Sequence, residues 1–217
     1  MTALRKTASV SIEDYLAGEQ DSEIKHEYLG GAVHAMAGGT ADHAAISANA
    51  IGSLFSQLRG KPCRTFTSDL KVRIDLPQHT RFYYPDVQVV CDSSAGDARY
   101  QERPVVVIEV LSESTRRTDL GEKKDAYLAI PSLKVLLLVE SDLPYVLVYR
   151  RRPEGGFAME VHDGVKAVIP LPEIEASLPL ADLYERIVFP PPAHPASCRR
   201  RYSRGERPVT CLKTREK

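Results

Sequence analysis

The sequence lacks any segment suited to a membrane. No run approaches the roughly 18 consecutive apolar residues of a membrane-spanning helix, and no apolar signal region follows the basic residues near the N-terminus. The cysteines contain no C-x-x-C pair and have no histidine at zinc-site spacing; they are Cys63, Cys91, Cys198 and Cys211. These absences argue against a structural zinc and a membrane partner, and they predict a cytoplasmic protein with reduced thiols.

Net charge is also absent, because 29 Lys and Arg balance 29 Asp and Glu. The balance hides an asymmetry: residues 190–217 carry eight basic and two acidic residues, which leaves 21 basic and 27 acidic residues before them. We predict a folded domain over residues 1–189 and a disordered basic tail over 190–217. The acidic domain shows no charge signature of nucleic-acid binding, and only the tail looks basic.

Apolar periodicity in the first third predicts helices around one short strand. We expect a helix over Ser11–Ala17, a Gly-Gly turn into a strand over 32–37, and a long helix from Thr40 to about Leu58. Thr40 stands at an N-cap position, and His43 lies on the inward stripe of the long helix. A lone histidine there is more often a core residue than a catalyst.

The middle of the chain is rich in strand patterns. Residues 63–67, 69–75 and 82–91 read as consecutive antiparallel strands of a meander, with Lys71 on the solvent face of the second. Residues 92–103 read as a loop.

The order of elements after this loop predicts an α/β fold. A strand starting at Pro104, a helix over Asp119–Ala129 and a strand over Leu133–Glu140 call for a crossover and a partly parallel sheet. Later segments, at 145–151, 157–162 and 165–169, predict a β-hairpin extension, and residues 180–187 a final helix.

Glu109 interrupts the otherwise apolar strand PVVVIEVL. An isolated ionised carboxylate in such a strand costs many kcal/mol unless it is paired, protonated or bound to a metal. A second carboxylate, Asp86, lies in the preceding strand, and Lys123 lies in the following helix. Together they suggest a divalent metal site, although a structural ion pair between Glu109 and Lys123 would serve equally well.

The helical spacing singles out one of two adjacent lysines. Asp119, Lys123 and Tyr127 follow an i, i+4 pattern and share a stripe, whereas Lys124 points about 100° away. An exposed lysine paired with Asp119 is the alternative interpretation of Lys123.

The chain resembles the Uma2 family, a branch of the restriction-endonuclease-like PD-(D/E)XK superfamily, through blocks that occur in order: EYLG, AVHAMAGGTADHAAISANA, SDLKVRI, YYPDVQVVCD, PVVVIEVLSEST and DLGEKKDAY. The resemblance covers roughly Ser11 to Glu185. It implies a mixed sheet flanked by helices, a divalent metal at the strand ends, and hydrolysis of phosphodiester bonds in DNA. The superfamily lysine lies two residues after the second acid; here that position is Leu111, and the resemblance implies a lysine from the following helix.

The resemblance also assigns roles. Asp86 and Glu109, with the backbone carbonyl of Val110, are expected to bind Mg²⁺ or Mn²⁺. Lys123 is expected to orient or deprotonate the attacking water and to neutralise developing charge.

Three further residues match the family blocks. Glu27 is expected to reach the metal through water, and His43 to contact metal-bound water or phosphate. Asp69 ranks below them, because turn capping already explains an Asp at the start of a strand.

Two functions from different classes follow. The first is a metal-dependent endonuclease acting on DNA, with homodimer formation left open. The second is a nuclease-fold protein that binds nucleic acid or a protein without cutting, which would suit an acidic domain. Hydrolysis of a small phosphate ester is a weaker third reading.

Overall fold

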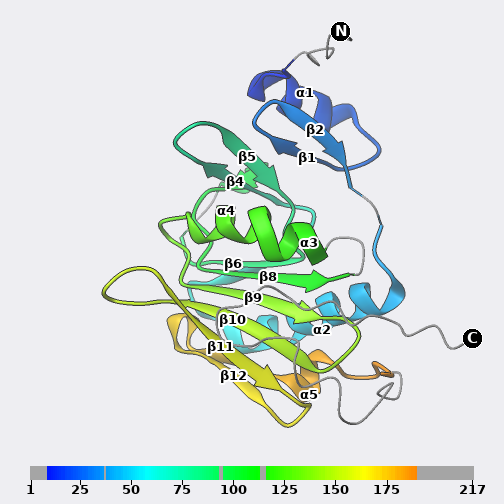
Figure 1. The fold of residues 1–217 in the computed structure, drawn as a ribbon, viewed down its shortest axis with the longest axis vertical. Helices are drawn as coiled ribbons and strands as arrows, with labels where there is room; N and C mark the ends of the chain where they lie inside the picture. Colours follow the sequence, from blue (N-terminus) through cyan, green and yellow to red (C-terminus); the bar gives the residue numbers. More distant parts are fainter. Residues whose placement is uncertain (1–8, 37, 93–94, 113–115, 190–217) are drawn as a thin grey trace, which may run out of the picture. The chain divides into compact units, whose positions relative to one another are not determined.

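Two mixed sheets organise the described residues, which are 9–36, 38–92, 95–112 and 116–189 of the computed structural model (Figure 1). The first sheet contains β1 (His26–Leu29), β2 (Ala32–Ala35), β4 (Lys71–Asp75), β5 (Thr80–Tyr83) and β7 (Tyr100–Gln101), in the order β2-β1-β5-β4-β7. The second contains β3 (Arg64–Thr67), β6 (Val87–Val90), β8 (Val106–Leu111), β9 (Val135–Glu140), β10 (Tyr145–Arg151) and β11 (Phe157–Asp163), in the order β11-β10-β9-β8-β6-β3. The predicted α/β class with a mixed sheet flanked by helices is confirmed.

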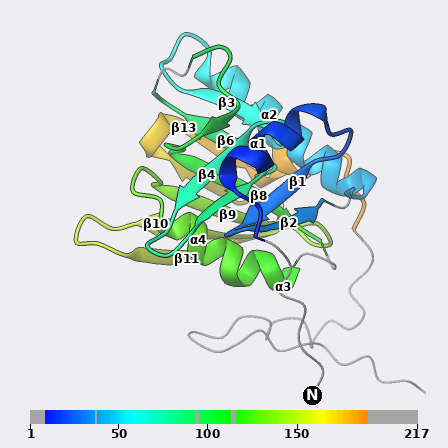
Figure 2. The ribbon, with the colours of Figure 1, turned by 90° about the horizontal axis from the view of Figure 1, so that it is seen from above.

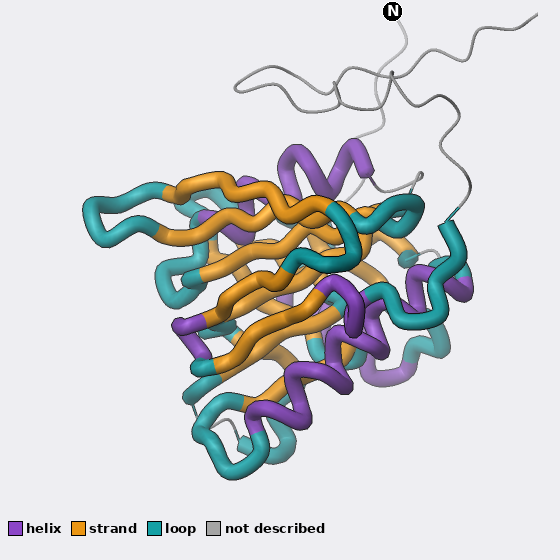
Figure 3. Tube along the Cα trace, turned by 90° about the horizontal axis from the view of Figure 1, so that it is seen from below, coloured by secondary structure: helices purple, strands orange, loops and turns teal. Residues whose placement is uncertain are grey.

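The six-stranded sheet is covered by helices on both faces. Helix α2 (Ala41–Leu58) lies on one face of this sheet. The segment that carries α3 (Arg116–Thr118) and α4 (Lys124–Leu128) lies on the other face (Figures 1, 2 and 3). Every residue of β8 and β9 is therefore buried, and these central strands pair in parallel. The predicted crossover connection is confirmed.

The N-terminal region folds onto the five-stranded sheet. Helix α1 (Ile12–Asp21) starts at the predicted cap, where Ser11 Oγ accepts a hydrogen bond from Asp14 N, and it ends later than predicted. The next segment is strand β1, which carries Glu27. A turn joins β1 to β2, in which Gly30 and Gly31 have φ of 60° and 103°, values that favour glycine.

The predicted meander is wrong, because the chain changes sheets at Pro85. Residues 82–91 are not one strand: β5 ends at Tyr83 in one sheet, and β6 begins at Val87 in the other. Proline has no N–H to donate to a strand ladder, which explains the break. Strand β3 pairs with β6, whereas β4 pairs with β5. The predicted loop 92–103 contains the short strand β7, which pairs in parallel with β4.

The alternation of apolar and charged residues predicts that Lys71 faces solvent. This prediction is wrong, because Lys71 is buried. Its ammonium lies 3.7 Å from Glu19 Oε2 and over the rings of Tyr15 and Tyr84, with 5.1 and 5.3 Å to the ring centroids. Helix α1 covers the face that the pattern assigned to solvent.

The helical segment after β8 is irregular. It consists of α3 (Arg116–Thr118), the π-helical turn η1 (Asp119–Lys123) and α4 (Lys124–Leu128). Gly121 has φ −106° and ψ −116°, outside the helical region, so the predicted regular helix is kinked there. The stripe survives the kink, since Asp119, Lys123 and Tyr127 are all buried.

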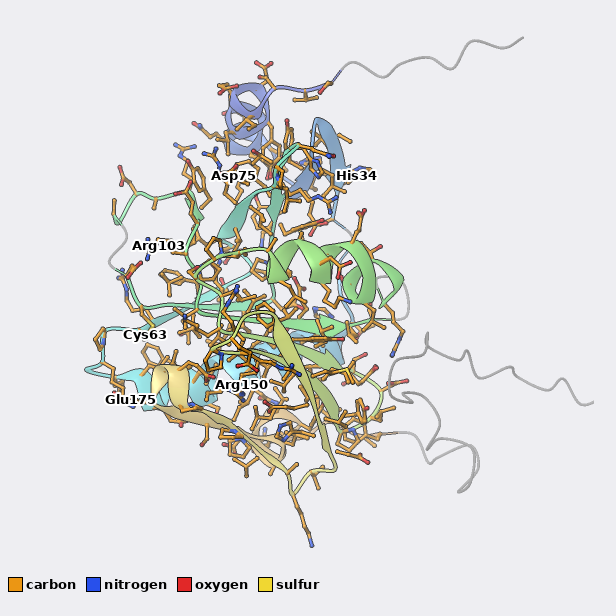
Figure 4. The ribbon with its side chains drawn as sticks, turned by 60° about the vertical axis from the view of Figure 1, so that its left-hand side comes forward. His34, Cys63, Asp75, Arg103, Arg150 and Glu175 are labelled. Carbon is orange, nitrogen blue, oxygen red and sulfur yellow. A yellow bond between two sulfur atoms is a disulfide. The ribbon has the colours of Figure 1, made fainter. Side chains whose placement is uncertain are left out.

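The C-terminal part extends the fold with two hairpins. Strand β11 pairs with β10 at the edge of the large sheet, whereas β12 (Val168–Leu171) pairs with β13 (Ala176–Pro179) across the turn η2 (Pro172–Ile174). The predicted single extension is therefore divided in two. Helix α5 covers only Leu180–Leu183 of the predicted final helix. Figure 4 shows Arg150 of β10 and Glu175 beside this part of the fold, and Asp75 and His34 on the five-stranded sheet.

The prediction of reduced thiols is wrong for two cysteines. Cys63 and Cys91 form a disulfide. They directly extend the register of β3 and β6, in which Arg64 faces Val90, so the strand pairing places them opposite each other. Cys198 and Cys211, with the predicted tail 190–217, lie outside the described residues. Within the described part of the chain, no helix has the length and apolar character needed to span a membrane.

Candidate active site

Lys123 lies at the centre of a buried cluster of carboxylates from three elements. Its Nζ lies 3.0 Å from Glu109 Oε1, 3.1 Å from Glu27 Oε1 and 3.9 Å from Asp119 Oδ1. Glu109 comes from β8 in the large sheet, Glu27 from β1 in the small sheet, and Asp119 from the turn that carries Lys123 itself. The lysine therefore connects both sheets.

The carboxyl group of Glu109 is strongly perturbed by its surroundings. Burial raises its pKa to about 8; the neighbouring charges of Asp86 and Asp119 act in the same direction, and Lys123 opposes them. Tyr127, one helical turn after Lys123, donates a hydrogen bond of 2.7 Å from its hydroxyl to Glu109 Oε1. Strand β8 therefore carries a carboxyl group whose ionised form is stabilised by any added positive charge.

Asp86 lies where the chain passes from one sheet to the other. Its Oδ2 accepts a 2.7 Å hydrogen bond from Val110 N, and its Oδ1 lies 2.8 Å from His43 Nε2. Val110 follows Glu109 directly, so this backbone contact fixes Asp86 against the same segment of β8. His43 sits in the first turn of α2, where Thr40 Oγ1 accepts from His43 N as predicted for an N-cap.

His43 and Lys123 are both biased towards their charged forms. The hydrogen bond that His43 Nε2 donates to Asp86 raises the pKa of His43 above its ordinary value, against the opposing effect of burial. Burial lowers the pKa of Lys123, but the carboxylates of Glu109, Glu27 and Asp119 outweigh burial and raise it. Lys123 is therefore a cation at neutral pH, which suits a group that neutralises charge better than a general base.

An open cleft of about 610 Å³ gives access to these groups. Asp86, Glu109, Asp119 and Lys123 line one part of it, and α2 forms a wall with Thr40, His43, Ala44, Ser47, Ala48 and Ile51. A second part is lined by Ile24, Lys25, Thr67, Ser68 and Tyr84. Among the described residues, the buried Nδ1 of His43 has no hydrogen-bond partner.

The structure brings together the side chains of all the predicted site residues except Asp69. Glu27, Glu109 and Lys123 form one group, His43 and Asp86 another, and the Val110 backbone lies between Asp86 and Glu109. The contact seen at Val110 is through its N–H, whereas the prediction concerned its carbonyl. Asp69 pairs instead with Lys25 and accepts from Thr67 Oγ1 in a turn.

Sequence reasoning named two members of the cluster without assigning them to the site. Asp119 and Tyr127 were placed on the stripe of Lys123, and the same i, i+4 spacing was enough to include them. Lys25 carried no signal in the sequence, because its position in the cleft depends on how β1 docks against the turn at Ser68.

The comparisons with known proteins agree with this fold. The Uma2 family model, described as "Putative restriction endonuclease", matches residues 12–181. The uncharacterised protein slr1290 of Synechocystis sp. is 35% identical over 147 residues, covering 67% of this chain and 76% of that protein. A second Synechocystis protein, sll1609, is 27% identical over 143 residues, covering 64% of this chain and 80% of that protein.

A solved structure has the same fold. The crystal structure of "a putative nuclease belonging to DUF820" from Anabaena variabilis matches with a TM-score of 0.62 and 21% identity, covering 77% of this chain and 93% of that one. The family match spans most of the sequence and includes every element that contributes to the cluster. The chain belongs to the Uma2 family.

Proposed function

We propose that this protein is a divalent-metal-dependent nuclease that hydrolyses phosphodiester bonds in DNA, with Mg²⁺ or Mn²⁺ as its cofactor. The observation that carries the proposal is the buried ion pair of Lys123 and Glu109 at 3.0 Å, beside Asp86 in an open cleft. Family membership supports a nuclease, and the arrangement supplies carboxylates and a cation at one place. A homodimer, a cytoplasmic location and the domain boundary at residue 189 remain predictions.

The donor set fits a hydrated magnesium site and does not fit an all-protein cage. In the described residues, no group of three or more His, Cys, Asp and Glu side chains is arranged to hold a metal. Mg²⁺ keeps several waters and commonly uses one or two carboxylates together with a substrate phosphate. Asp86 and Glu109 would hold it, and the raised pKa of Glu109 marks a carboxyl that gains from a nearby cation. When bound, the metal supplies Lewis-acid activation of water and of the phosphate.

The protein's own groups have separate roles in this proposal. Lys123 neutralises charge that develops on the phosphate oxygens and orients the attacking water, and its raised pKa supports this over proton abstraction. His43 and the Val110 N–H fix the two oxygens of Asp86. Tyr127 fixes Glu109 through its hydroxyl.

A non-cleaving nucleic-acid-binding protein is the second candidate. Lys123 already compensates Glu109, Glu27 and Asp119 without a metal, and such a cluster is sufficient as a structural element. Cleavage assays distinguish this candidate from the first.

Calorimetric titration with Mg²⁺ and Mn²⁺, combined with a DNA cleavage assay, tests the proposal. Asp86→Asn and Glu109→Gln are expected to abolish metal binding and cleavage while the fold is retained. Asp125→Asn is the control, because this carboxylate pairs with Lys124 on α4 and has a side chain that is 71% exposed. Unchanged metal affinity in both site variants would remove the metal site, and metal binding without any cleavage would favour the second candidate.

A further inference from the structure

The cleft presents two lysines in very different states. Among the described residues that line it, the lysines are Lys25 and Lys123, and the carboxylates are Asp86, Glu109 and Asp119. Lys123 is buried with its partners, and separating it from them would leave carboxylates unpaired in a dry site. Lys123 therefore stays in the cluster and serves only the phosphate at the reacting position. A strand that extends along the cleft needs another positive group for its next phosphate.

Lys25 is held by a partner that water can replace. Its Nζ lies 2.6 Å from Asp69 Oδ1 and donates to the carbonyl of Ser68 at 3.0 Å. The Lys25 side chain is 39% exposed and that of Asp69 is 81% exposed, so the pair is a surface ion pair of small net value. A phosphate oxygen can compete for this ammonium at little cost.

Asp69 does not depend on Lys25 for its position. Thr67 Oγ1 donates to Asp69 Oδ2 at 3.1 Å and accepts from Asp69 N at 3.3 Å, which closes the turn between β3 and β4. The carboxylate would therefore stay in place when the lysine changes partner. The ammonium also lies 5.7 Å from the ring centroid of Tyr84, another lining residue, which keeps its stem along the cleft wall.

We propose that Lys25 binds a backbone phosphate of a single DNA strand lying in the cleft, and that Asp69 is the counter-ion which this phosphate displaces. The inference rests on the proposed nuclease function and names how its substrate is held. The cleft volume of about 610 Å³ falls within the ~300–1,000 Å³ of small-ligand sites, so it accommodates a short segment of one strand. Asp69 acts here as an internal competitor that lowers affinity for anions.

The test measures binding of a fluorescein-labelled single-stranded 12-mer by anisotropy in EDTA, so that neither metal binding nor cleavage enters the result. Lys25→Gln is expected to weaken binding roughly 5- to 10-fold at low salt and to reduce the salt slope by about 0.7, the value for one phosphate contact on a single strand. Asp69→Asn is expected to tighten binding about 2- to 5-fold. In the Lys25→Gln background, Asp69→Asn should have no such effect.

A second exposed pair provides the matched control. Lys61 lies 3.8 Å from Glu175 Oε2, with side chains 31% and 82% exposed, and neither residue lines the cleft. Figure 4 shows Glu175 well away from the five-stranded sheet. That sheet contains β1, which begins directly after Lys25. Lys61→Gln and Glu175→Gln control for the effect of net charge on DNA affinity. Each should change the affinity less than Lys25→Gln or Asp69→Asn does.

The outcomes separate this inference from the proposed function. Opposite effects of Lys25→Gln and Asp69→Asn, with a double variant that binds like Lys25→Gln alone, support the inference, even if no cleavage is ever found. Weaker binding in both variants, equal effects in the control pair, or no measurable binding by the wild type would overturn it, even if the enzyme cleaves DNA through Glu109 and Lys123.

Discussion

At the scale of single residues, the cluster is organised by one ammonium shared among carboxylates. Lys123 is within 3.1 Å of both Glu109 and Glu27, which belong to different sheets. Its charge therefore contributes to stability and to the proposed chemistry at once. A variant that keeps the apolar stem separates the effect of charge from that of packing, because it removes the charge without opening a cavity.

We expect Lys123→Met to lower the free energy of unfolding by roughly 3–5 kcal/mol at pH 8, since it leaves buried carboxylates unpaired. Cleavage should fall by about 10² to 10³, the usual effect of losing one group that stabilises charge in the transition state. Lys124→Met is the control, and it should change stability by less than about 0.5 kcal/mol. Urea unfolding and single-turnover cleavage measure both effects. Full activity in Lys123→Met would remove this residue from the chemistry.

Glu109 predicts a pH dependence of stability with a defined sign. Because its pKa is raised from 4.5 to about 8, the folded state binds a proton that the unfolded state has released between these values. The stability from this protonated carboxyl is fully present below about pH 4.5, and it is lost as the pH rises through 8. Relative to Glu109→Gln, the wild type should lose on the order of 3 kcal/mol between pH 5 and pH 8.

Urea unfolding in EDTA at several pH values measures this difference between the wild type and Glu109→Gln. Adding Mg²⁺ at pH 8 should restore part of the lost stability of the wild type alone. A difference that stays constant with pH would show that Glu109 remains ionised throughout.

The site was more predictable than the fold at this scale, and the reason is physical. Glu109 was recognisable because a carboxylate in an apolar strand needs compensation, and Lys123 because helical spacing distinguishes it from Lys124. Lys71 was mispredicted by the same kind of reasoning, since alternation within β4 does not reveal that α1 covers its outer face.

At the scale of elements, strand pairing decides which sheet each strand joins. The pattern of apolar residues within a strand does not encode that pairing. The alternating strand β4 and the apolar strand β6 were assigned to one meander, yet they belong to different sheets. Pro85 was the available signal for the break. Helix α2 was predicted well because its cap and its stripe, from Ile46 to Leu58, are local features.

The disulfide gives a prediction for the β3–β6 pair. Cross-linking residues 28 positions apart restricts the unfolded chain, which is worth about 3.6 kcal/mol in the loop-entropy model. Reductant should therefore lower the melting temperature of the wild type. The Cys63→Ser, Cys91→Ser double variant should melt lower than the oxidised wild type and show no response to reductant. A wild type that melts identically with and without reductant would contradict the prediction.

At the scale of the whole molecule, charge is divided between the acidic domain and the basic C-terminal sequence. Removing residues 190–217 takes away eight basic residues and two acidic ones. We expect the melting temperature to stay unchanged, and affinity for DNA to fall at low salt through loss of counterion release. Binding across a salt series compares the full and truncated chains. Equal salt slopes would show that this segment does not bind DNA.

The connection of both sheets through Lys123 also bears on synthesis of the chain. Glu27 leaves the ribosome early, and the last strand of the five-stranded sheet, β7, is complete before the cation that neutralises Glu27 has been made. Glu109 follows, again ahead of Lys123. A nascent chain therefore accumulates unpaired carboxylates until the kinked segment around Gly121 emerges and docks. The site therefore cannot assemble before residue 123 of the 217 has been made, and a chain released before that point carries the acids without their counter-ion.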